Sequence, residues 1–110
     1  METITQDELK QAKEDIEKDV NSHKVVLYMK GNKMAPQCGF SGQVVQVLNQ
    51  ANIEFETRDI LQDEVLRQAI KEYSEWPTLP QLYVNGEFIG GCDIVMELAQ
   101  SGELSTILSS

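Results

Sequence analysis

The chain is poor in the residues that most often build disulfide frameworks and metal centres, because its 110 residues include two cysteines and one histidine. Two cysteines are too few for the disulfide scaffold of a small secreted protein. Together with His23 they cannot form the usual four-ligand zinc pattern. No apolar run approaches the length of a membrane span, and no charged-then-apolar leader opens the chain. We therefore expect a cytoplasmic protein with reduced thiols and no membrane contact.

Positive charge is also scarce, since 9 Lys and Arg residues stand against 18 Asp and Glu residues and give a formal net charge of −9. That balance excludes nucleic acid as a favoured ligand, because its binding depends on neutralising phosphates. The exception is the segment 23–53, which has Lys24, Lys30 and Lys33 and no acidic residue. A solvated lysine cluster would give the same pattern. However, Cys38 lies in this segment, and nearby cations favour a thiolate and attract anions.

A length of 110 residues is typical of one domain with its own core, so we expect a single domain over 1–110. A capping box at Thr5 and Glu8, followed by apolar residues at helical spacing, predicts a first helix that ends near Asn21. The remaining patterns predict, in chain order, a strand at 24–29, a loop at 30–37, a helix from 39, a strand at 53–59, a helix at 63–73, a hairpin at 81–90 that turns at Asn85 and Gly86, a helix capped by Asp93 and stopped by Gly102, and one or two further turns.

Strands separated by helices predict a parallel pair with a right-handed crossover, and the hairpin adds antiparallel strands. The expected fold is a three-layer α/β/α sandwich around a four-stranded mixed sheet, which is the plan of the thioredoxin fold. In such a sheet the loop after the first strand faces the ligand crevice, and Cys38 begins the helix there. The helix N-terminus should lower the pKa of Cys38, which makes it a candidate nucleophile and metal ligand. A small buried hydrophobic residue is the alternative for a free cysteine.

In the stretch from Cys38 to Ser41, serine stands where a dithiol redox motif has its second cysteine, so thiol exchange or metal binding at Cys38 needs an external thiol. Three blocks occur in order, and together they are specific. The chain resembles the monothiol glutaredoxins of the Cys-Gly-Phe-Ser type, in their short single-domain form, over essentially its whole length. The blocks are Lys30-Gly31 through Pro36-Gln37-Cys38-Gly39-Phe40-Ser41, then Trp76-Pro77-Thr78-Leu79-Pro80-Gln81, then Gly90-Gly91-Cys92-Asp93.

The resemblance implies a glutathione site. Lys30 and Arg67 match positions that hold the glycine carboxylate of glutathione, although each could be an ordinary surface charge. The backbone of Leu79, in a cis-proline turn, would pair with the cysteinyl part of glutathione. The N–H groups of Cys92 and Asp93 would bind the γ-glutamyl carboxylate, and the Asp93 side chain its ammonium. Cys92 would otherwise be a packed structural residue, or an occasional disulfide partner.

The resemblance also implies a function as an iron-sulfur carrier. A 2Fe-2S cluster takes four thiolates, and the family bridges one across a homodimer through the cysteine and a glutathione from each side, here Cys38. Iron-sulfur acceptor apoproteins and BolA-like proteins would be the partners. Two alternatives stay open: a glutathione-dependent thiol-disulfide oxidoreductase that forms a Cys38 mixed disulfide, and an adaptor that reports iron status with BolA-like proteins. A cysteine hydrolase using Cys38 and His23 would lack an orienting acid and oxyanion donors.

Overall fold

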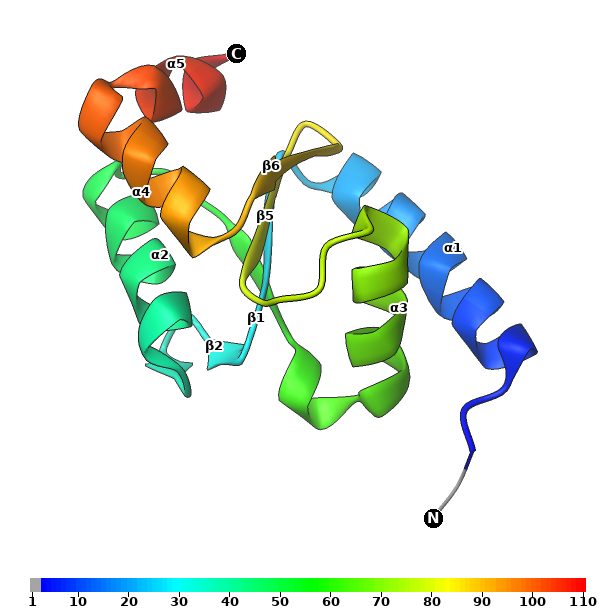
Figure 1. The fold of residues 1–110 in the computed structure, drawn as a ribbon. Coiled ribbons are helices and arrows are strands. Elements are labelled where there is room, and N and C mark those ends of the chain that lie inside the picture. Colours follow the sequence, from blue (N-terminus) through cyan, green and yellow to red (C-terminus); the bar gives the residue numbers. More distant parts are fainter. Residues whose placement is uncertain (1–2) are drawn as a thin grey trace.

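A four-stranded mixed sheet with helices on both faces forms the centre of the protein in a computed structural model that describes residues 3–110 (Figure 1). The strands β1 (Val25–Met29), β4 (Glu56–Asp59), β5 (Gln81–Val84) and β6 (Glu87–Gly90) lie in the order β4-β1-β5-β6. β1 pairs parallel with β4 and antiparallel with β5. The β5–β6 hairpin turns through Asn85 and Gly86, both with positive φ. This topology is the predicted thioredoxin-like fold.

Alternate residues of β1 divide the core into two layers. Val25, Leu27 and Met29 pack in one apolar cluster with α2 (Gly39–Gln50), α4 (Cys92–Ser101) and α5 (Glu103–Ser109). Val26 and Tyr28 pack in a second cluster with α1 (Gln6–Ser22) and α3 (Glu64–Ser74). Because successive strand residues point to opposite faces, an uninterrupted apolar strand buried on both sides gives the predicted α/β/α sandwich.

The helix signals mark the helix starts well. Thr5 caps α1, accepting a hydrogen bond from the Glu8 N–H at 3.1 Å, while the Glu8 carboxylate accepts from the Thr5 N–H. Asp63 caps α3 through the Leu66 N–H at 3.0 Å. Such caps satisfy N–H groups that have no partner inside the helix. Within residues 3–110, no helix combines the length and the apolar character that a membrane crossing requires.

Three local predictions were wrong. The strand expected at 53–59 begins at Glu56, because Phe55 is buried by packing against the core and not by strand pairing. The expected loop at 30–37 contains a small hairpin of β2 (Gly31–Asn32) and β3 (Ala35–Pro36). Asp93 does not cap α4. The N-cap is Gly91 and makes no side-chain hydrogen bond, so Asp93 lies within the first turn.

Candidate functional site

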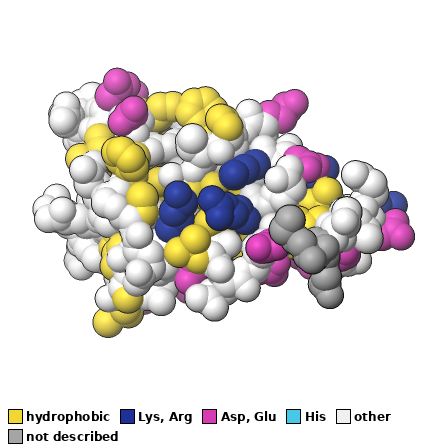
Figure 2. Space-filling model, turned by 60° about the horizontal axis from the view of Figure 1, so that its bottom comes forward, with side chains coloured by type: hydrophobic (Ala, Val, Ile, Leu, Met, Phe, Trp, Pro, Cys, Tyr) yellow, Lys and Arg dark blue, Asp and Glu magenta, His cyan; other side chains and the backbone are white. Residues whose placement is uncertain are grey.

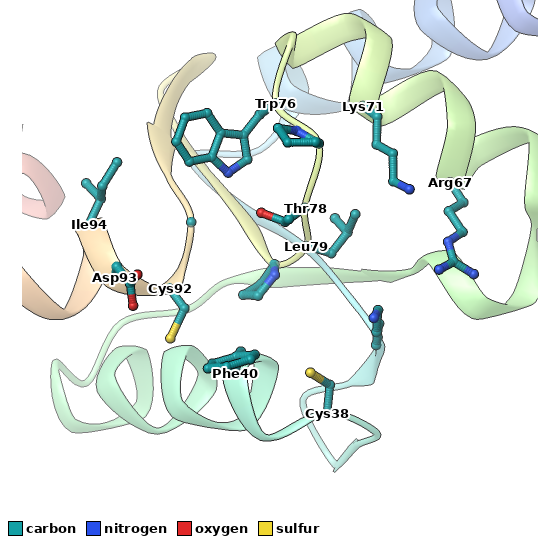
Figure 3. Close-up of a pocket in the computed structure, with 14 residues that line it drawn as sticks. Cys38, Phe40, Arg67, Lys71, Trp76, Thr78, Leu79, Cys92, Asp93 and Ile94 are labelled. Atoms are coloured by element: carbon teal, nitrogen blue, oxygen red, sulfur yellow. The ribbon is translucent and has the colours of Figure 1, made fainter.

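All six residues singled out from the sequence line one cavity of about 660 Å³. The cavity lies between the start of α2, the inner side of α3, the segment before β5, and the start of α4 (Figure 3). The structure therefore brings these residues together, whereas their individual roles stay predictions. The lining consists of Lys30, Cys38, Phe40, Arg67, Lys71, Trp76, Pro77, Thr78, Leu79, Pro80, Gly91, Cys92, Asp93 and Ile94.

Cys38 occupies the N-cap position of α2, as predicted. Its extended backbone lets its carbonyl accept the Gly42 N–H at 2.9 Å, which starts the helix. The thiol makes no capping hydrogen bond of the usual side-chain type, and the residue is half-exposed. In Figure 3 its sulfur points from the start of α2 into the cavity. A ligand in the cavity can therefore reach the sulfur.

The start of α2 favours the thiolate form of Cys38. The backbone N–H group of Ser41, at the start of α2, is the largest influence and lowers the pKa of the Cys38 thiol below its ordinary value of 9.0. Partial burial opposes this effect, whereas the Phe40 N–H, the charge of Lys30 and the Ser41 hydroxyl add to it. The lowered pKa increases the share of thiolate near neutral pH, and thiolate is the form that attacks sulfur and binds metal.

Ser41 does more than occupy the position of a missing cysteine. Its side chain is completely buried, and its Oγ accepts the Lys30 N–H at 3.2 Å. The hydroxyl thus connects the end of β1 to the start of α2. Sequence patterns carried no sign of this contact, because it joins residues whose proximity depends on the fold.

Three cations, Lys30, Arg67 and Lys71, line the cavity. Arg67 and Lys71 extend from α3 toward it (Figure 3), and Figure 2 shows Lys and Arg side chains gathered beside hydrophobic ones on this face. None of the three side chains forms an ion pair among residues 3–110. Lys71 escaped the sequence prediction, although its spacing of four from Arg67 places both on one face of a helix. Unpaired cations in a concave surface favour an anionic ligand.

The segment before β5 is held in shape by Gln81, whose side chain is completely buried. Its Nε2 donates to the carbonyls of Trp76 and Thr78, both at 3.1 Å, while its Oε1 accepts from the Tyr83 hydroxyl at 3.1 Å. The peptide bond between Leu79 and Pro80 is cis, as the resemblance implied. Gln81 therefore fixes a turn that forms one wall of the cavity.

The start of α4 forms the far end of the cavity. The backbone of Gly91 packs closely there, because a Cβ at this position would lie 3.3 Å from Trp76 Nε1 and 3.4 Å from the Pro80 carbonyl oxygen. The exposed Asp93 carboxylate has no hydrogen bond or ion pair to any residue of 3–110. Since it does not cap the helix, it is available to a cationic group of a ligand.

The two cysteines lie in the same cavity and differ in character. Cys92 donates a hydrogen bond from its Sγ to Gln43 Oε1 at 3.3 Å. Burial raises the pKa of the Cys92 thiol, and the negative charges of Asp93 and Cys38 raise it further. Both cysteines are free thiols here. Of the two thiols, Cys38 is therefore the one that more readily becomes a thiolate.

No group of three or more His, Cys, Asp or Glu residues able to hold a metal ion is found among residues 3–110.

Comparison with known proteins identifies the family of this fold and site. A family model described as Glutaredoxin matches residues 25–89. An uncharacterized monothiol glutaredoxin ycf64-like protein of Synechocystis is 57% identical over 98 residues, covering 89% of this chain and 92% of the relative. The chloroplastic monothiol glutaredoxin-S14 of Arabidopsis thaliana is 58% identical over 94 residues, which cover 86% of this chain but 54% of the plant protein.

Solved structures give the same result. Reduced poplar apo GrxS14 has 60% sequence identity and a TM-score of 0.76, with 86% of each chain covered. A complex of buckwheat glutaredoxin with glutathione has 28% identity and a TM-score of 0.87, covering 96% of this chain and 94% of the other.

Proposed function

This chain belongs to the monothiol glutaredoxins, and from that premise we propose that it is a glutathione-dependent carrier of 2Fe-2S clusters in cluster assembly and transfer. The cluster is its cargo, taken up from one protein and delivered to another. The observation that carries the proposal is a single thiol of lowered pKa at the edge of a cavity lined by unpaired cations. Such a site offers one metal ligand, the Cys38 sulfur, and a pocket for an anionic molecule that could bring a second one.

The donor set of one chain is incomplete for this cargo. A 2Fe-2S cluster takes four thiolates, and Cys38 supplies one. Cys92 is a poor second donor, because its pKa is raised and its thiol is engaged with Gln43. One glutathione per chain adds a second thiolate, and two chains complete the four. The cluster-bridged homodimer follows from this count.

The cavity matches the chemistry of glutathione, which has two carboxylates, one ammonium and one thiol. Lys30 and Arg67 would hold the glycine carboxylate, with Lys71 as a further cation at the same end. The Leu79 backbone would pair with the cysteinyl part. At the other end, the first N–H groups of α4 would bind the γ-glutamyl carboxylate, and Asp93 its ammonium. The glutathione complex of buckwheat glutaredoxin supports this choice of ligand.

The wider setting is part of the proposal. Half of the cluster's ligands are exchangeable small molecules, so the assembled dimer should release its cargo readily to acceptor apoproteins. BolA-like proteins are the other expected partners. We place the protein in the cytoplasm, although the relatives from Oryza sativa and Arabidopsis thaliana are named chloroplastic.

Anaerobic reconstitution tests the proposal. The protein would be incubated with iron and sulfide, with and without glutathione, followed by visible absorption and size-exclusion chromatography. We expect charge-transfer bands and a dimer only when glutathione is present. Cys38→Ser should abolish both, whereas Cys92→Ser, the matched control, should spare most of the cluster. Equal loading without glutathione, or loading of Cys38→Ser, would overturn the proposal.

A glutathione-dependent oxidoreductase is the second candidate, favoured by the half-exposed Cys38 thiol and its lowered pKa. In that reaction the Cys38 sulfur attacks the glutathione sulfur of a glutathionylated protein and releases the protein thiolate. A second glutathione then attacks the mixed disulfide, regenerates Cys38 and leaves as glutathione disulfide. Steady-state reduction of a glutathionylated peptide measures this activity. Rapid turnover by a protein that takes up no cluster would favour the oxidoreductase over the carrier.

A further inference from the structure

Asp59 does not line the cavity, but one of its carboxylate oxygens accepts a hydrogen bond from Gly31, which follows the cavity residue Lys30. It is the last residue of β4 and the N-cap of the short 3₁₀ helix η1 (Ile60–Gln62). Its Oδ1 accepts the Leu61 N–H at 2.9 Å, which is the ordinary capping bond. The same Oδ1 accepts the Gly31 N–H at 2.9 Å, 28 residues away in the sequence. The second bond has no role in the capping of η1.

Gly31 is the point at which the chain turns sharply after β1. Its φ is +88°, and a Cβ there would lie 2.5 Å from the Ala35 carbonyl oxygen and 2.7 Å from the Gln37 nitrogen. The turn packs backbone against backbone, so it has no spare room. A hydrogen bond to the Gly31 N–H therefore fixes both the turn and the residue before it.

That preceding residue, Lys30, has its backbone held from several sides. Its N–H donates to Ser41 Oγ at 3.2 Å, and its carbonyl accepts the Gln37 N–H at 2.9 Å. The Asp59 bond to the next peptide completes the set. Gln37 directly precedes Cys38. The hydrogen bond between Gln37 and Lys30 therefore sets the position of the Lys30 backbone relative to the Cys38 sulfur. A long lysine side chain loses less freedom on binding an anion when its base is already fixed.

We propose that Asp59 is a positioning residue, which holds Lys30 and Cys38 in the relative placement that glutathione binding needs by anchoring the Gly31 peptide to the end of β4. This role rests on the proposed glutathione site. It makes a prediction opposite to that of simple electrostatics. Removing a negative charge from the protein should, if anything, strengthen the binding of an anion, whereas removing an anchor should weaken it.

Three substitutions separate these effects. Asp59→Asn removes the charge but keeps an Oδ1 acceptor, so its glutathione affinity should equal that of the wild type or exceed it. Asp59→Ala removes charge and acceptor, and should weaken binding about 3- to 10-fold, the range expected for loss of one anchoring hydrogen bond. Asp59→Ser retains an N-cap for η1 with a side chain too short for Gly31, so it should weaken binding similarly while folding well.

Glutathione binding can be followed through Trp76, the one tryptophan of the chain, which lines the cavity. Fluorescence titration gives the dissociation constant, and thermal unfolding is recorded for every variant. Thr5→Ala is the structural control, because it removes the cap of α1, far from the cavity lining. It should lower the Tm without changing affinity.

The outcomes distinguish the two levels of the account. A wild-type protein that binds no glutathione would defeat the proposed function itself. If the wild type binds and Asp59→Ser binds equally well or more tightly, only the positioning role of Asp59 is wrong. Weaker glutathione binding by Asp59→Asn than by the wild type would also overturn the positioning role, because this variant keeps the Oδ1 acceptor. If Asp59→Ala does not fold, Asp59→Ser decides the question.

Discussion

Replacing Ser41 by alanine should lower the free energy of unfolding and raise the pKa of the Cys38 thiol. Both effects are expected because the buried Ser41 hydroxyl interacts with the Lys30 N–H and with the Cys38 thiol. Ser41→Ala removes the acceptor of the Lys30 N–H, which costs about 1 to 3 kcal/mol for a buried donor. The lower end applies, since the bond is 3.2 Å long and Lys30 is half-exposed. The better helix propensity of alanine offsets about 0.5 kcal/mol. A net loss of about 0.5 kcal/mol should lower the Tm by about 2 °C.

The same substitution should shift the reactivity of Cys38 to higher pH. The Ser41 hydroxyl is one of the groups that lower the pKa of the Cys38 thiol below 9.0. Alkylation by iodoacetamide, measured against pH in a Cys92→Ser background, reports this pKa, because thiolate is the reacting form. The wild-type midpoint should lie below pH 9, and that of Ser41→Ala should lie higher. The shift should be partial, since the Ser41 backbone N–H, the largest influence, remains.

The pH dependence of the free energy of unfolding should show the same change in the pKa of Cys38. A folded-state pKa that is lowered adds stability above the unfolded pKa, and this stability is lost as pH falls through the folded pKa. The difference in stability between wild type and Ser41→Ala should therefore be larger near pH 9 than near pH 6. Ser109→Ala, which removes an exposed hydroxyl bonded to the Ser105 carbonyl, is the control and should change neither quantity. Identical alkylation midpoints for wild type and Ser41→Ala would refute this reasoning.

Three further substitutions test other parts of the account. Asp19→Ala should lower the free energy of unfolding by about 2 to 3 kcal/mol in urea titrations, because Arg58 loses two hydrogen bonds of 2.8 Å, and glutathione affinity should not change. Although burial opposes it, Arg58 holds the pKa of Asp19 below 3.8, so this contribution should persist above pH 3.8 and vanish as pH falls further. Gly91→Ala places a methyl group 3.3 Å from Trp76 Nε1 and should weaken glutathione binding a few-fold with little change in Tm; unchanged affinity would argue against this cavity. Arg67→Ala should weaken binding about 10-fold at low salt and less at high salt, and a salt-independent loss would contradict an ionic role.

The fold was predictable because several independent signals coincide in this chain. Three signals each specify a local structure: the capping box at Thr5, the strand β1 with apolar residues on both faces, and the Asn85-Gly86 turn. Their order along the chain leaves few topologies. The ends of elements were less certain, as with Phe55, because a buried apolar residue looks the same in a strand and in a packed lead-in.

The residues singled out from the sequence share one cavity, but the contacts that connect them were not predicted. The residues that resemble the family's motif line one cavity, since motif residues carry chemical identity. The buried contacts of Ser41 and Gln81, and the anchor from Asp59 to Gly31, escaped prediction because they join segments brought together only by folding. A small hairpin before Cys38 was also missed, because its two-residue strands are too short for any periodic pattern.

Native mass spectrometry of the anaerobically loaded protein tests the central claim most directly, because it counts the ligands that share the cargo. The account predicts a complex of two chains, two glutathione molecules and one 2Fe-2S cluster, with no loaded species for Cys38→Ser. A cluster held by chains that have bound no glutathione would contradict it.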